Sequence, residues 1–182
     1  MEDLSLHILD CTENSIRAGA TIITIIIEEQ RADNMLTITI EDNGHGMDKE
    51  TLNKVKDPFF STKPDKKTGL GISLLAQATH ESEGMFDIRS APNRGTKITA
   101  TFRYDHIDRK SLGNMADTII ALIASGSGRV DIRYVHTFNG RSFIFDTKTI
   151  KKELQDIPIN DPAVLADLKK QLENAVQEIR ET

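Results

Sequence analysis

The segment 21–42 restricts the fold of this chain more than any other stretch. It reads TIITIIIEEQRADNMLTITIED, and its first half is dominated by isoleucine and threonine. Such β-branched runs favour buried strands, and the alternation of Leu36, Ile38 and Ile40 with polar residues is typical of a half-buried strand. The polar RADN turn between the two runs predicts an antiparallel hairpin. The other elements must therefore pack on a β-sheet.

The elements on either side of this hairpin predict an α+β fold. Residues 3–18 carry apolar residues at roughly helical spacing, and further helices are predicted around 49–56 and 71–79. MFDIRS at 85–90 and TKITATFRY at 96–104 have the composition of two more strands. The order helix, strand, strand, helix, helix, strand, strand predicts a two-layer α/β sandwich, with a mixed, mostly antiparallel sheet and helices on one face.

After residue 105 the sequence changes character, so we predict two units, 1–105 and a small C-terminal α/β appendage at 106–182. MADTIIALIAS predicts a helix, and the Asn-Gly dipeptide between VDIRYVHTF and RSFIFDT is a strong hairpin signal. The last stretch places Asp161 at a helix N-cap and Pro162 at the first helical position. Its single apolar stripe is expected to pack on its own domain, and contact in a homodimer or with another partner is the alternative.

Composition excludes several classes of protein. The chain has 182 residues, a net charge of -5 and a single cysteine, Cys11. One cysteine allows no internal disulfide framework and favours a reducing, cytoplasmic location. The N-terminus lacks the pattern of a signal peptide, and the apolar runs are far too short to span a membrane. The acidic balance disfavours binding to nucleic acid.

The stretch HILDCTENSIRAGA carries the first candidate binding residues. Asp10 and Asn14 are four apart and share a helix face, and Arg17 joins the edge of that face. An asparagine carbonyl oxygen suits a hydrated magnesium ion, and an arginine can neutralise phosphate oxygens. A carboxylate beside them can hydrogen-bond a water and act as a base. The alternative for this stretch alone is an ordinary solvated helix face.

Two further stretches have the residues of a base-binding pocket. EDNGHGM places Asp42 at a strand end, where it can accept a hydrogen bond from an exocyclic amine such as that of adenine. Gly44 and Gly46 permit tight backbone geometry near a flat ring. In NRGTKITATF, the hydroxyl of Thr96 could hydrogen-bond the same base or a water beside it. Taken alone, the first stretch could be an Asx turn and the second a turn glycine.

The stretch DPFFSTKPDKKTGLGISLL has the pattern of a phosphate-side lid. Gly69 and Gly71 precede a helix, whose first backbone N–H groups can meet phosphate oxygens. The lysine-rich segment 63–67 adds positive charge. The chain contains no GxxxxGK[ST] motif, so this is not a Walker-type loop. Alone, the pattern also fits a flexible loop before a core helix.

In this order the four stretches resemble the GHKL superfamily of gyrase, sensor histidine kinases and MutL, whose members share the Bergerat ATP-binding fold. HILDCTENSIRAGA resembles the N box, DNGHGM the first glycine box, TGLGISLL the second, and NRGTKITATF the closing GT motif. PFFSTK resembles the phenylalanine box of histidine kinases, the group that the chain resembles most over residues 4–104. Within the first of these stretches, the residues ENSIRAGA also resemble MutL.

The resemblance implies that the chain binds ATP with magnesium (Mg²⁺) under a lid. It implies that Asn14 ligates magnesium, that Asp10 takes the place of the usual glutamate base, and that Asp42 binds the adenine amine. The other residues implied to surround the nucleotide are Arg17 near the phosphates, Gly44 and Gly46 in the pocket, Thr96 at the base, Phe59 and Phe60 as anchors of the lid, and Lys63, Thr68, Gly69, Leu70 and Gly71 in the lid and its hinge.

The sequence departs from this pattern in two respects. Asp10 is one methylene shorter than glutamate, so we expect turnover to be slow or Asp10 only to polarise water. None of the five histidines lies in the H-E/D-x-x-x-P pattern of a phospho-acceptor, and the ATP-binding segment is expected to start at the first residues.

The leading prediction is a kinase of histidine-kinase type that acts in trans, transferring the γ-phosphoryl group to a His or Ser of an unknown partner in two-component-like signalling. The alternatives are a nucleotide-gated interaction module with little turnover and a MutL-like ATPase, which the acidic charge disfavours.

Overall fold

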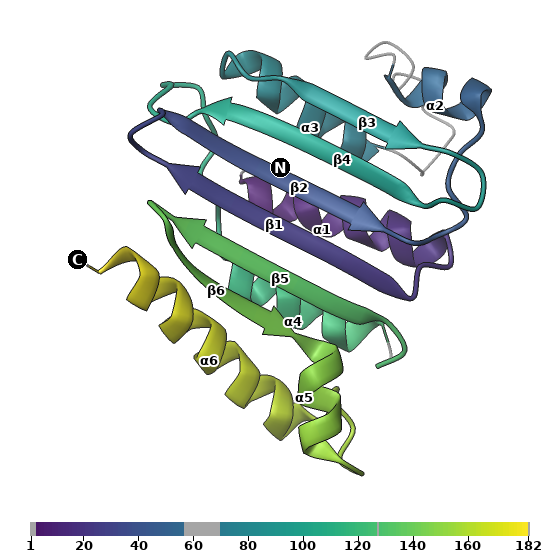
Figure 1. Ribbon diagram of the computed structural model, residues 1–182, viewed down its shortest axis with the longest axis vertical. Coiled ribbons are helices and arrows are strands. Elements are labelled where there is room, and N and C mark those ends of the chain that lie inside the picture. The colour runs from purple at the N-terminus through teal and green to yellow at the C-terminus, as the bar shows by residue number, and fades with distance from the viewer. Residues whose placement is uncertain (1–2, 57–69, 127, 182) are drawn as a thin grey trace.

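The computed structural model describes residues 3–56, 70–126 and 128–181 and contains one sheet of six strands (Figure 1). The strands lie in the order β3-β4-β2-β1-β5-β6, and every neighbouring pair is antiparallel except β1 and β5. Their bounds are β1 Ile22–Gln30, β2 Met35–Asp42, β3 Phe86–Ser90, β4 Thr96–Arg103, β5 Asp131–Phe138 and β6 Arg141–Asp146. The predicted mixed, mostly antiparallel sheet is confirmed.

Helices form the second layer. Figure 1 shows α1, α3 and α4 side by side against one face of the sheet. The helix bounds are α1 Leu4–Arg17, α2 Lys49–Lys56, α3 Leu70–Glu81, α4 Met115–Ser125, α5 Thr147–Leu154 and α6 Pro162–Arg180. Helix α6 starts as predicted, because the Asp161 side chain accepts a hydrogen bond from the Ala163 N–H and Pro162 occupies the first turn. Helix α5 was not predicted. Its sequence is mostly polar, and it begins where the Asp146 side chain caps the Lys148 N–H.

The predicted hairpin forms the middle of the sheet. Strands β1 and β2 pair antiparallel, with Ile25 opposite Ile40. Ile23, Ile25 and Ile27 have no exposed surface and lie in the main apolar core, which also includes residues of α1, α3 and α4. The intervening residues of β1 are exposed or half-buried, with Ile22 46% exposed. Because side chains alternate along a strand, the helix-covered face takes every second isoleucine.

The C-terminal segment continues the same sheet rather than standing apart. Strand β5 pairs in parallel with β1, from Ile22 opposite Asp131 to Glu29 opposite Phe138. The segment before α4 also caps α1, because the N–H groups of Leu4 and Ser5 donate to carbonyl oxygens of residues 111 and 112, at 2.9 and 2.8 Å. These donors have no partner inside their own helix. The division at residue 105 remains a prediction, and the two segments share one core.

No helix in the described ranges is both long enough and apolar enough to cross a lipid bilayer.

Candidate functional site

A cavity of about 470 Å³ lies between α1, α2 and the ends of β2 and β4. Asn14 and Arg17 from α1 line it, together with Asp42 at the end of β2, Gly46 in the following loop and Thr96 at the start of β4. The fourth candidate stretch reaches the same cavity through Ile72, so all four stretches meet there although they are far apart along the sequence. Its volume falls in the usual range for small-molecule sites.

Asp42, which lines this cavity, is held in a fixed orientation by two hydrogen bonds. The Ser15 hydroxyl donates to its Oδ2 at 2.6 Å, and the Gly44 N–H donates to its Oδ1 at 2.8 Å. Each carboxylate oxygen has further lone pairs, so the group can still accept a hydrogen bond from a ligand. Ser15 is 5% exposed and lies on the face of α1 that meets the sheet. Its role could not be read from the sequence, where it is one polar residue of an amphipathic helix.

Two glycines bring the loop after β2 into contact with the turn between β3 and β4. Gly46 has φ +67°, and a Cβ there would lie 2.0 Å from the carbonyl oxygen of Ala91. Gly95 has φ +72°, and a Cβ there would lie 1.8 Å from the carbonyl oxygen of Asp42. Both positions therefore need glycine, for the left-handed backbone and for the close approach. Gly44 is also tightly packed, since a Cβ there would lie 2.9 Å from the Ala18 carbonyl oxygen.

On α1, Arg17 and Asn14 contact each other directly. The Arg17 guanidinium donates to Asn14 Oδ1 at 2.8 Å and to Glu13 Oε2 at 3.1 Å. All three side chains are at least partly exposed, so the arginine has room to move. Asn14 Oδ1 is the oxygen that would meet a metal ion, and the positive charge of Arg17 beside it would oppose a second cation there. An anionic ligand that draws Arg17 away would free this oxygen.

Asp10 lies beside the first turn of α3. A Cβ on Gly71 would be 2.5 Å from Asp10 Cβ and 3.3 Å from its Oδ2, so the absence of a side chain lets α3 approach α1 here. The N-terminus of a helix favours a negative charge. Asp10 thus lies against the second glycine stretch, but it is not among the residues that line the cavity, and its role as a base remains a prediction.

Several predicted residues cannot be placed. Phe59, Phe60, Lys63, Thr68 and Gly69 lie outside the described residues, and Leu70 is described only as the first residue of α3. The prediction of a lid therefore remains a prediction.

The structure adds cavity-lining residues that the sequence patterns did not indicate. Thr51, Lys54 and Val55 reach the cavity from α2, and His45 and Met47 from the glycine loop. Cys11 also lines the cavity, but it is only 2% exposed. Burial raises the pKa of its thiol to about 12, so the thiol stays protonated at neutral pH.

The described residues fit a magnesium ion that is held mainly by the phosphate oxygens of a bound small molecule and by water. Within the described ranges, no group of three or more His, Cys, Asp or Glu side chains gathers in a metal-binding arrangement. Mg²⁺ in nucleotide sites commonly takes one or two protein oxygens, with phosphate oxygens and water as its other ligands. The single carbonyl oxygen of Asn14 suits that kind of site better than a site made by protein ligands alone.

Comparison with known proteins agrees with the geometry. Residues 2–106 match the family described as histidine kinase-, DNA gyrase B-, and HSP90-like ATPase. The chain is 39% identical over 99 residues to the signal transduction histidine-protein kinase AtoS of Escherichia coli (strain K12), and 26% identical over 102 residues to sporulation kinase A of Bacillus subtilis (strain 168). These matches cover 54% and 56% of this chain but only 16% of each relative.

The structural likeness extends further along the chain. The Aquifex aeolicus MutL ATPase domain complexed with ADP has a TM-score of 0.51 and 15% identity, covering 85% of this chain and 70% of that one. At this identity the likeness concerns the fold alone, and it includes part of the C-terminal segment. Since the family model matches more than half of the 182 residues, the chain belongs to the family of histidine kinase-, DNA gyrase B- and HSP90-like ATPases, a part of the superfamily that its four motifs predicted.

Proposed function

We propose that the chain binds magnesium–ATP in the cavity between α1, α2 and the ends of β2 and β4. We further propose that it transfers the γ-phosphoryl group to a His or Ser of a partner protein. The observation that carries this proposal is the convergence of Asp42, Asn14 and Arg17 on one cavity of about 470 Å³. The lining includes a fixed carboxylate, Asp42, and a cation, Arg17, and both kinds of group are needed to bind a nucleoside triphosphate. The likeness to histidine kinases supports the reaction class.

Each group has a distinct role in this proposal. Asp42 accepts a hydrogen bond from the exocyclic amine of adenine, and its Ser15 and Gly44 contacts keep it aimed at the cavity. Arg17 turns from Asn14 towards the phosphates and neutralises their charge. Asn14 would then hold the magnesium ion, which supplies charge neutralisation of the phosphates. The protein's main contribution to phosphoryl transfer is positioning.

The position of Asp10 favours a second candidate function, a nucleotide-gated module with little turnover. Its side chain is short, lies beside Gly71 and does not line the cavity. A base that is about 1 Å out of place can lose about two orders of magnitude in rate. In this case bound ATP, hydrolysed only slowly, would control the binding of a partner.

A single set of experiments separates these functions. The protein is incubated with magnesium and γ-labelled ATP, alone and with candidate partner proteins, and compared with Asp10→Ala and Asp42→Asn. Label that appears on a partner or as free phosphate, and is lost in Asp10→Ala, supports a kinase or ATPase that uses Asp10. ATP that is bound but stays intact in both the wild type and Asp10→Ala supports the nucleotide-gated module. ATP affinity that is unchanged in Asp42→Asn would contradict the proposed site itself.

A further inference from the structure

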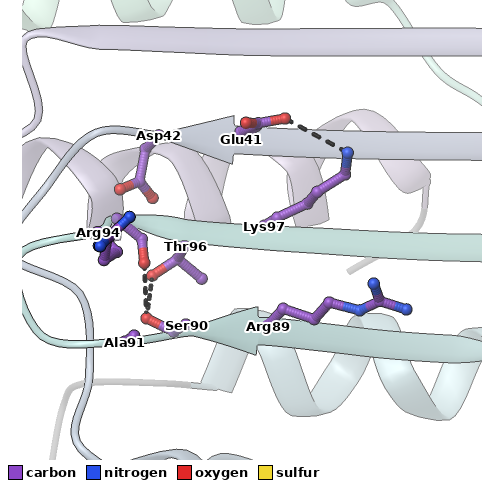
Figure 2. A pocket seen from close by; sticks show the side chains of 9 residues that line it. Glu41, Asp42, Arg89, Ser90, Ala91, Arg94, Thr96 and Lys97 are labelled. Atoms are coloured by element: carbon purple, nitrogen blue, oxygen red, sulfur yellow. Dashed lines mark hydrogen bonds and ion pairs between the residues drawn. The ribbon is translucent and has the colours of Figure 1, made fainter.

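The hydroxyl of Ser90 lies at the centre of a hydrogen-bond network at the base end of the cavity. Ser90 on β3 is opposite Thr96 on β4, and Thr96 is opposite Asp42 on β2. Residues that are directly opposite on neighbouring strands share a face of the sheet, so the three side chains form a row (Figure 2). Thr96 and Asp42 line the cavity of about 470 Å³, and together with Ser90 they also line a second pocket of about 310 Å³, which is the one that Figure 2 shows.

The direction of each hydrogen bond in this row follows from counting protons. Ser90 Oγ lies 2.7 Å from the carbonyl oxygen of Gly95 and 3.0 Å from Thr96 Oγ1, and the Met47 N–H donates to it at 2.9 Å. The carbonyl oxygen can only accept, so the single Ser90 proton points to it. Ser90 Oγ must then accept from Thr96, as it does from the Met47 N–H. The Thr96 proton therefore points at Ser90 and away from the cavity.

This arrangement leaves Asp42 and Thr96 as hydrogen-bond acceptors towards a bound base. The carboxylate of Asp42 has no proton to donate, and Thr96 has given its one proton to Ser90. Adenine carries a donating amine at position 6, which matches such a site. Guanine and hypoxanthine carry a carbonyl oxygen at that position, and its lone pairs would face those of Asp42 and Thr96.

We propose that Ser90 is a positioning residue that sets the preference for adenine over 6-oxopurines, by holding the Thr96 hydroxyl as an acceptor. The inference rests on the proposed nucleotide site and adds a determinant of base selection to it. Hypoxanthine and guanine can still donate their N1–H to Asp42, so the discrimination rests on the 6-carbonyl oxygen, which finds no donor as long as Thr96 is held as an acceptor. The expected preference for ATP over inosine triphosphate is on the order of tenfold to a hundredfold.

The test measures the dissociation constants of ATP and inosine triphosphate, with magnesium, for the wild type and three variants of the full chain. In Ser90→Ala the Thr96 hydroxyl is free to rotate and donate to the oxygen of hypoxanthine, so we expect the ATP preference to fall about five- to tenfold. Ser90→Cys, whose thiol is a weak donor and acceptor, should lower it in the same direction. Ser90→Thr keeps the hydroxyl on a strand residue and should retain the wild-type preference.

The ratio of the two constants separates positioning from a loss of structure. A variant that merely loosens the loop would weaken both nucleotides equally, and an unchanged ratio in a folded Ser90→Ala or Ser90→Cys would overturn the inference alone. Circular dichroism of each variant establishes which of them fold. Failure of the wild type to bind either nucleotide would overturn the proposed function and this inference with it.

Discussion

Leu122→Ala tests whether the C-terminal segment and the nucleotide-binding segment unfold as one unit. Leu122 lies on α4, has no exposed surface and belongs to the same apolar core as the isoleucines of β1. Helix α4 packs against both α1 and α6, and the Thr118 hydroxyl donates to the Ser5 carbonyl oxygen at 3.3 Å. A cavity made here should therefore weaken the packing of α1, the helix that carries Asn14.

The expected loss follows from the burial of the side chain. Truncation of a fully buried leucine to alanine costs about 2–5 kcal/mol, compared with a total stability of about 5–15 kcal/mol for a typical protein. In chains of about 150–250 residues, each kcal/mol shifts the melting temperature by about 2–4 °C. A loss of about 3 kcal/mol should thus lower the melting temperature by about 6–12 °C.

Urea unfolding combined with hydrogen exchange gives the decisive measurement. If the chain is one cooperative unit, the slowest amides of β2 and of β5 should lose the same free energy of opening as the whole protein loses in urea. Ala121→Ser, on the exposed side of α4, is the matched control and should change stability by about 0.5 kcal/mol or less. Destabilisation of β5 with no change in β2 would refute this reasoning and support independent units.

Acidification should destabilise the fold through Glu29, which is 3% exposed. Burial alone would raise its pKa, but the hydrogen bond with His136, together with nearby charge, lowers it below the ordinary 4.5. Its stabilisation is therefore complete above pH 4.5 and is lost as the pH falls towards the lower folded pKa, so Glu29→Gln should flatten the acid limb of a stability–pH curve. An unchanged limb would show that another group controls it. Gly46→Ala should weaken ATP binding by at least tenfold and lower the urea midpoint, because the new Cβ would lie 2.0 Å from the Ala91 carbonyl oxygen, and wild-type behaviour in both measurements would contradict the packing described here. Asn14→Ala should remove the magnesium dependence of ATP affinity, measured by titration with and without the ion, and a dependence that persists would exclude Asn14 as the metal ligand.

Much of the fold was predictable because its signals are local. The hairpin of β1 and β2, the α4 helix and the cap of α6 each follow from residues that are neighbours in the chain. The parallel insertion of β5 beside β1 does not, because it joins residues 22–29 to residues 131–138. No local turn sequence predicts a parallel pairing of distant segments, and the apolar pattern of β5 is equally compatible with a separate hairpin.

The site shows the same division. The sequence by itself predicted that Asp42, Gly46 and Thr96 belong to one pocket, because their stretches follow one another in the order of a known family, and the three residues line one cavity. Only the tertiary structure decided that Ser15 and Ser90 orient these groups. A serine in a helix or at a strand end has no distinctive pattern, and its effect depends on which atom lies within about 3 Å of its hydroxyl. Those neighbours come from other strands and helices, so cross-strand register and helix packing, rather than local sequence, determine them.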